Sequence, residues 1–154
     1  EIYKSRDNIN SIAHAHPMYG KTFSTLGKTL DPISQDSCAF YERTALFADY
    51  DGVANGPDEG INIAKALGEK DFVILQNHGI LTTGTMVDTT IWYFLNMEDA
   101  CKSQLLAEAV GKPIIIPHET ACATRDYVAN DLSAYVSFQP TVDVLWEEEP
   151  DLLD

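Results

Sequence analysis

Four consecutive apolar residues, Phe72-Val73-Ile74-Leu75, constrain the fold of this chain more than any other feature. Successive side chains of a strand point to opposite faces of its sheet, so an unbroken apolar run indicates a strand buried on both faces. Short strands alternate along the chain with helical patterns. We therefore expect a layered α/β domain.

Helices are predicted on either side of this strand in the sequence. Residues 56–67 begin Gly-Pro-Asp-Glu, which places Pro in the first turn and acids at the positive end of the helix dipole. Gly68 follows as a C′ residue with positive φ. The longest helix is predicted over residues 85–110 and opens with a capping box between Thr85 and Asp88. Its apolar stripe, which should pack on the sheet, comprises Val87, Ile91, Trp92, Phe94, Leu95, Met97, Cys101, Leu105 and Ala109.

The other expected elements are shorter. A helix end precedes residue 7, and further strands are predicted at 10–16, 80–83 and 114–116. Helices are predicted at 18–26, closed by Gly27, and at 119–130. Between residues 29 and 50 we expect a short strand, a loop around Asp31-Pro32 and a helical turn near 38–44, followed by a strand or hairpin edge at 50–53.

Length and charge narrow the class of protein. The chain has 154 residues, which argues for one domain over residues 1–154. Its formal net charge is −14, and phosphate backbones and anionic membranes are bound by Lys and Arg, so neither nucleic acid nor a membrane is an expected partner. Acidic residues accumulate near the end, and we interpret residues 140–154 as a solvated, extended acidic tail.

The three cysteines, Cys38, Cys101 and Cys122, are odd in number and far apart in sequence. This pattern argues against a disulfide framework and against a cysteine-based zinc site. Reduced thiols, the lack of an apolar stretch that could span a bilayer and the lack of a signal peptide favour a cytoplasmic protein. The first residue is Glu1 instead of Met, which suggests a fragment or a processed chain.

The histidines are the sharpest chemical feature. His14 and His16 lie two residues apart in a predicted strand, so both imidazoles can reach one point. His78 is a natural third ligand, because it follows the buried strand in a turn where Gly79 permits an unusual backbone angle. Three imidazoles and one open position suit a catalytic zinc ion. Taken alone, however, such a pair is more often exposed or hydrogen-bonded than metal-bound, and we interpret His118 as a helix-entry residue outside the site.

Several segments carry a family resemblance through their order and spacing. They read His-Ala-His-Pro at 14–17, Phe-Ser-Thr-Leu-Gly at 23–27, Asp-Glu-Gly at 58–60, Val-Ile-Leu-Gln-Asn-His-Gly at 73–79, Gly-Thr-Met-Val-Asp at 84–88 and Gln-Leu-Leu-Ala-Glu-Ala at 104–109. Together they resemble the class II aldolase/adducin superfamily, from the first residues to about Gly111. The set is specific, whereas any one motif alone is not.

The resemblance implies a three-layer α/β/α domain with a mixed, largely antiparallel central sheet. It implies that His14, His16 and His78 hold Zn²⁺ or another divalent transition metal. It also implies a homo-oligomer, such as a tetramer, and a small-molecule carbonyl or sugar-phosphate substrate. The implied reaction of a lyase of this kind is aldol or retro-aldol cleavage through a metal-stabilised enediolate.

Parts of the family pattern are missing. In the aldolases, the acid/base glutamate and the phosphate-binding residues precede the paired histidines, in a part of the domain that this chain lacks. Glu1 lies too close to His14 to be that glutamate. Asp36, Tyr41 and Tyr19 are candidates for a helper acid or base, although the tyrosines suit core or interface packing equally well.

The catalytic residues therefore stay open, and so do alternatives to an aldolase. These are a related epimerase or decarboxylase, an adducin-like non-enzymatic interaction module, and a fragment whose function belongs to a longer protein.

Overall fold

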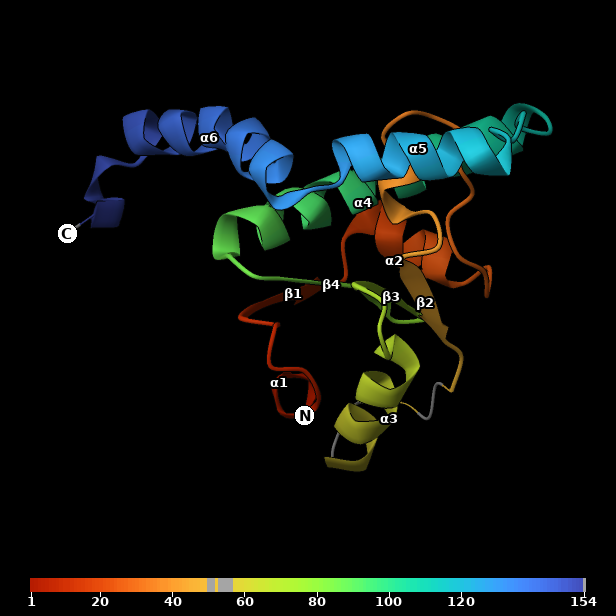
Figure 1. Ribbon diagram of the computed structural model, residues 1–154, viewed down its shortest axis with the longest axis horizontal. Coiled ribbons are helices and arrows are strands. Elements are labelled where there is room, and N and C mark those ends of the chain that lie inside the picture. The colour runs from red at the N-terminus through yellow and green to blue at the C-terminus, as the bar shows by residue number, and fades with distance from the viewer. Residues whose placement is uncertain (50–51, 53–56, 154) are drawn as a thin grey trace.

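A four-stranded sheet lies between two layers of helices in the computed structural model, which describes residues 1–49, 52 and 57–153 (Figure 1). The strands are β1 (Ser11–Ala15), β2 (Thr44–Phe47), β3 (Phe72–Leu75) and β4 (Gly79–Gly84). The α-helices are α1 (Ile2–Ser5), α2 (Met18–Ser24), α3 (Pro57–Leu67), α4 (Val87–Val110), α5 (His118–Val128) and α6 (Asp131–Glu148), and two 3₁₀ turns are η1 (Ser37–Phe40) and η2 (Pro150–Leu153). No helix among these residues combines the length and apolarity needed to cross a membrane.

The sheet has the strand order β1-β4-β3-β2. The β1–β4 and β3–β4 pairs are antiparallel, and the β2–β3 pair is parallel. In the β1–β4 ladder His14 lies opposite Leu81 and Ala15 opposite Ile80. The predicted three-layer α/β domain with a mixed, largely antiparallel sheet is therefore confirmed.

Strand β3 is buried on both faces, as its sequence predicts. Phe72 and Ile74 belong to a core built with residues of α2 and α4, whereas Val73 and Leu75 belong to a second core built with residues of α1 and α3. Burial of a side chain of this size stabilises the fold by about 1.5–3 kcal/mol. One strand thus holds both helical layers to the sheet.

The buried face of α4 is only partly the predicted stripe. Met97 is fully buried, but Val87 is 64% exposed. Tyr93 and Gln104 are buried although neither was expected to be. Gln104 tolerates burial because its side-chain oxygen accepts from the Asp31 N–H at 2.9 Å and its amide donates to the Asp31 carboxylate at 2.6 Å. Apolar periodicity alone cannot identify such a polar core residue.

The predicted capping box at the start of α4 is wrong. The N-cap position is Met86, and its side chain makes no capping bond. The Thr85 hydroxyl instead donates to the Asp131 carboxylate at 2.7 Å, and Asp88 accepts from the Gln139 amide at 3.2 Å. Both residues of the expected capping box therefore bind α6, a helix that is absent from the predictions above.

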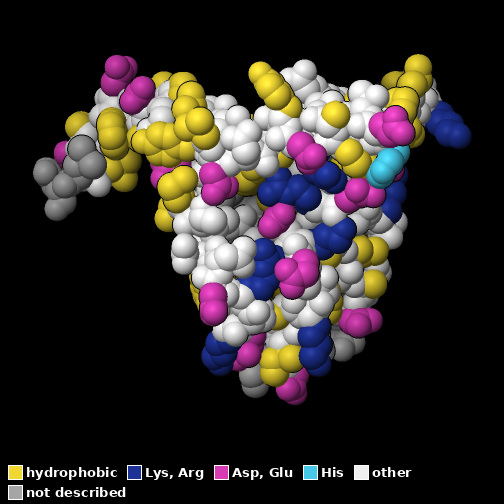
Figure 2. Space-filling model, viewed as in Figure 1, with side chains coloured by type: hydrophobic (Ala, Val, Ile, Leu, Met, Phe, Trp, Pro, Cys, Tyr) yellow, Lys and Arg dark blue, Asp and Glu magenta, His cyan; other side chains and the backbone are white. Residues whose placement is uncertain are grey.

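Helix α6 also corrects the expected extended tail, because residues 140–148 are helical. The helix begins at the N-cap Asn130, whose side chain accepts from the Ser133 N–H at 3.0 Å. Figure 2 shows hydrophobic side chains gathered along this part of the surface. Of the α6 side chains, Leu132 is 72% exposed and Trp146 is 49% exposed.

Two short predicted strands do not form where they are expected, and a third lies mostly outside the described residues. No strand forms at 114–116, where the Ile116 N–H donates to the Pro32 carbonyl at 2.9 Å but no ladder follows. The short strand expected before the loop at Asp31-Pro32 does not form, and the strand of this segment is instead β2, which begins at Thr44 after η1. Most of the edge predicted at 50–53 lies outside the described residues.

Candidate metal centre

The structure brings His14, His16 and His78 together. Their ring centroids are 5.1 Å apart for His14–His16, 4.9 Å for His14–His78 and 4.4 Å for His16–His78. One nitrogen from each ring can be chosen so that all three lie within 4.8 Å of one another. The pair comes from β1 and the residue that follows it, and the third histidine from the turn between β3 and β4. The three candidate ligands named from the sequence therefore lie together.

His14 is oriented by the sheet itself. Its Nδ1 lies 2.9 Å from the carbonyl oxygen of Ile80. A carbonyl oxygen can only accept, so Nδ1 carries the hydrogen and the lone pair of the ring is on Nε2. A backbone carbonyl that fixes the second ring nitrogen is the usual companion of a metal-binding histidine. The carbonyl of Ile80 is a functional group that sequence reasoning missed, because its position depends on the β1–β4 register.

Glycine at position 79 serves a different purpose from the one predicted. Among non-glycine residues it is Asn77 that adopts the left-handed conformation in this turn, with φ of 59°. At Gly79 the constraint is space, because an added Cβ would lie 2.5 Å from the Ala15 carbonyl oxygen and 3.2 Å from Cδ2 of His16. The missing side chain lets the His78 turn approach β1 closely enough for the histidines to meet.

The electrostatic setting of His78 favours a neutral ring. Burial lowers the pKa of His78, the neighbouring His14 and His16 lower it further, and Glu59 opposes them. The lowered pKa keeps the imidazole unprotonated at neutral pH, which is the form that can bind a metal. His14 and His16 are exposed and His78 is half-buried, so the group is open to a small molecule.

The segment after His16 is anchored from α4. The Glu98 carboxylate accepts from the backbone N–H groups of Tyr19 at 2.8 Å and Gly20 at 2.5 Å, which satisfies free donors at the start of α2. Tyr19 is half-buried against the core, with the Lys102 ammonium 5.3 Å from its ring centroid. This placement suits the packing role of Tyr19.

The other helper candidates contact different elements. The Tyr41 hydroxyl lies 3.2 Å from Nδ1 of His118 on α5, and Asp36 is the N-cap residue of η1. A hollow of about 530 Å³ also lies along α5, lined in part by Glu119 and Tyr127, and none of the three clustered histidines lines it. The structure therefore places no helper acid or base from these candidates at the histidines.

Comparison with known proteins agrees with this fold. Residues 1–105 match the family model described as "Class II Aldolase and Adducin N-terminal domain". The chain belongs to this family. It is similar to decarboxylase NovR of Streptomyces niveus, at 36% identity over 152 residues, covering 99% of this chain and 56% of the relative.

Two further matches represent the aldolase and adducin branches. A solved structure of L-fuculose 1-phosphate aldolase from Glaciozyma antarctica PI12 superposes with a TM-score of 0.87 at 39% identity, covering 97% of this chain and 57% of that one. Rat alpha-adducin is 35% identical over 113 residues, covering 71% of this chain and 15% of the adducin. The chain thus spans little more than half the length of its enzyme relatives.

Proposed function

We propose that this chain supplies the metal-binding half of a zinc-dependent lyase. The substrate would be a sugar phosphate or a small hydroxy-carbonyl compound, cleaved by an aldol or retro-aldol reaction. The observation that carries the proposal is the convergence of His14, His16 and His78, with His14 held by the Ile80 carbonyl. A non-enzymatic module has no need of three such histidines.

The donor set fits a divalent transition metal. Zinc–nitrogen bonds of 2.0–2.1 Å in a tetrahedral site place ligand nitrogens about 3.3 Å apart, and side-chain rotations that bring together nitrogens now within 4.8 Å would reach that distance. Three imidazole ligands leave one position open and suit zinc, and other divalent transition metals bind the same donors. Bound there, the ion supplies Lewis-acid chemistry for charge that develops beside a carbonyl.

The residues of the chain have separate tasks in this proposal. His14, His16 and His78 hold the ion and leave one side open to substrate oxygens. The Ile80 carbonyl keeps Nε2 of His14 directed at the ion. A proton donor or acceptor is also required, and we expect it from residues outside this chain, which spans 56% and 57% of the two enzyme relatives named above.

Metal content is the first test. We expect the protein with zinc to lose about one equivalent per chain on substitution His78→Ala. Asn62→Ala, at an exposed residue of α3, serves as the control and should keep the full metal content. Unchanged zinc in a folded His78→Ala variant would refute the site.

Cleavage of ketose phosphates and hydroxy acids by the protein in its full natural length is the second test. We expect turnover with at least one compound and its loss in His14→Ala. No turnover by the zinc-loaded protein with any of them would refute the lyase proposal.

Two other functions have support of their own. The similarity to decarboxylase NovR favours a related decarboxylase or epimerase that uses the same metal to stabilise charge after loss of CO₂ or a proton. Release of CO₂ in the panel, without aldol products, would distinguish it. The similarity to alpha-adducin favours a non-enzymatic interaction module, which predicts no turnover at all.

We further propose that the protein is a homo-oligomer, with a tetramer as the expected state, in the cytoplasm. The exposed apolar side chains of α6 support assembly, since surface patches of this kind mark interaction sites. Cys38, Cys101 and Cys122 are free thiols, which suits a reducing compartment. Sedimentation at micromolar concentration should give a tetramer, and a monomer would refute the assembly.

A further inference from the structure

A second group of metal-ligand side chains lies at the start of α5 and shares no residue with the histidine site. It consists of Glu42, His118 and Cys122. His118 and Cys122 are four residues apart on α5, so they lie on one face of the helix, one turn apart. Glu42 comes from the turn between η1 and β2, 76 residues before His118, as the numbering shows. Two distant parts of the chain thus bring three different donor types together.

The distances among these donors approach those of a bound zinc ion. Cys122 Sγ lies 3.7 Å from Oε2 of Glu42, and 3.8 Å and 3.9 Å from Nδ1 and Nε2 of His118. Zinc bonds of about 2.3 Å to sulfur and about 2.0–2.1 Å to nitrogen or oxygen place tetrahedral ligands about 3.5 Å apart. A contraction of a few tenths of an ångström therefore completes a three-ligand site with one open position.

The geometry distinguishes a metal site from a nucleophile–base–acid triad. In such a triad the histidine lies between its partners, with the thiol at one ring nitrogen and the carboxylate at the other. Here the Glu42 carboxylate and the Cys122 sulfur each lie 3.8 Å from the same nitrogen, Nδ1, and the carboxylate lies 3.7 Å from the sulfur itself. The three donors converge on one another instead of forming a relay.

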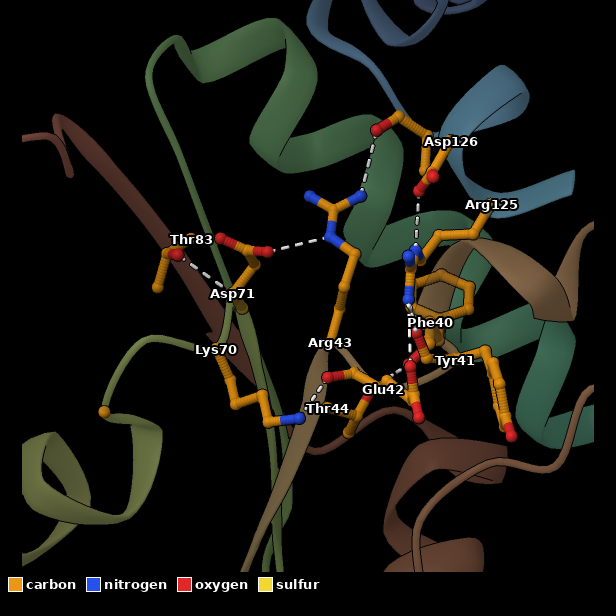
Figure 3. A network of polar contacts seen from close by, with 12 residues as sticks. Phe40, Tyr41, Glu42, Arg43, Thr44, Lys70, Asp71, Thr83, Arg125 and Asp126 are labelled. Atoms are coloured by element: carbon orange, nitrogen blue, oxygen red, sulfur yellow. Dashed lines mark hydrogen bonds and ion pairs between the residues drawn. The ribbon is translucent and has the colours of Figure 1, made fainter. Parts of the chain in front are cut away.

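Neighbouring groups hold these donors in place. The Tyr41 hydroxyl lies 3.2 Å from Nδ1 of His118, and the two ring centroids are 5.9 Å apart, so Tyr41 holds the His118 ring beside Glu42. The Arg125 guanidinium lies 3.3 Å from Oε2 of Glu42, and the Lys70 ammonium donates to the Glu42 backbone carbonyl (Figure 3). Arg125 offsets part of the charge of a carboxylate and a thiolate, and the other carboxylate oxygen faces His118.

We propose that Glu42, His118 and Cys122 form a second site for a thiophilic divalent cation, with zinc as the best match. Sulfur, nitrogen and oxygen donors at this spacing suit zinc or cobalt more than the oxygen-seeking magnesium or calcium. The ion links the start of α5 to the turn before β2. Because it closes a long stretch of chain, its binding should stabilise the folded protein.

Cobalt titration tests this proposal independently of the histidine site. A cobalt–thiolate bond gives a near-ultraviolet charge-transfer band, whereas a site made of three imidazoles gives none. We expect the band in the wild-type protein and in His78→Ala, and its loss in Cys122→Ser and His118→Ala. His78→Ala and His118→Ala serve as controls for each other, since each should remove only its own equivalent of metal.

A second readout covers the case in which a variant folds poorly. Zinc added to the wild-type protein should slow alkylation of Cys122 by iodoacetamide at least tenfold, and Glu42→Gln should weaken this protection. Absence of the cobalt band in the wild-type protein, or its persistence in folded Cys122→Ser, would overturn the second site. Neither result bears on the three histidines, whose failure appears separately as unchanged metal content in His78→Ala.

Discussion

Replacing Gly79 by alanine is expected to separate the three histidines without altering any of them. The added Cβ would lie 2.5 Å from the Ala15 carbonyl oxygen, where a carbon–oxygen contact needs about 3.3 Å or more. The strands β1 and β4 must therefore move apart by about 0.8 Å at this point. His16 moves with Ala15, and the bond between His14 and the Ile80 carbonyl lengthens.

This displacement should lower both the folding stability and the zinc affinity of the variant. Overpacking of this kind costs about 1–3 kcal/mol of folding stability. A metal site tolerates errors of only about 0.2 Å in its ligand distances, and loss of an orienting partner alone lowers metal affinity about 10- to 100-fold. We therefore expect Gly79→Ala to weaken zinc binding at the histidine site by at least tenfold, or about 1.4 kcal/mol. Competition with a chelator measures this affinity, and urea unfolding of the metal-free protein measures stability.

Gly84→Ala is the matched control at the other end of β4. Its Cβ would lie 2.4 Å from the Thr90 hydroxyl, so a comparable loss of stability is expected. This contact is with α4, at the end of β4 away from the histidines. Zinc affinity should stay within about twofold of the wild-type value. Equally tight zinc binding by folded Gly79→Ala and Gly84→Ala would contradict this expectation.

Three other predictions follow from single residues. Burial raises the pKa of Cys101 to about 12, so its thiolate fraction at pH 8 is about 10⁻⁴. Mass spectrometry should therefore find Cys101 alkylated only after unfolding. Alkylation of Cys101 before Cys122 would contradict this prediction. Folding lowers the pKa of His78 from 6.5, so the unfolded chain binds the proton more tightly. The metal-free protein should therefore lose stability as pH falls below about 6.5, and His78→Asn should reduce that slope in urea titrations; identical slopes would count against it. Gln104→Leu should lower the free energy of unfolding in urea by about 1–3 kcal/mol, because the Asp31 N–H and carboxylate lose their hydrogen-bond partner. A decrease of less than about 0.5 kcal/mol would show that water replaces the amide.

The features that depend on local pattern could be predicted from the sequence. The apolar run Phe72–Leu75 indicated a strand buried on both faces, and the two-residue spacing of His14 and His16 placed both rings on one face. The approach of His78 followed from the family resemblance more than from chemistry. Periodicity and propensity act within a few residues, so they describe such elements well.

The features that depend on tertiary contacts could not be predicted in the same way. The bond from His14 to Ile80 requires the register of two strands that are 66 residues apart. The capping box failed because Thr85 binds Asp131, a residue of the unanticipated α6. A signal for α6 was present, since Asn130 three residues before Ser133 is a typical cap, but Pro140 inside the helix and the acidic residues near its end concealed it.

The antiparallel ladder between β1 and β4 also links metal binding to the register in which the two strands pair. Ile12, on the same side of β1 as His14 and His16, packs toward α1 and α3. A slip of β1 by one residue would turn both rings to the opposite face, where α4 packs on the strand, and would leave His78 without companions. An ion bound by the three rings would therefore stabilise only the correct register of β1 on β4, because a slipped strand lacks the complete ligand set.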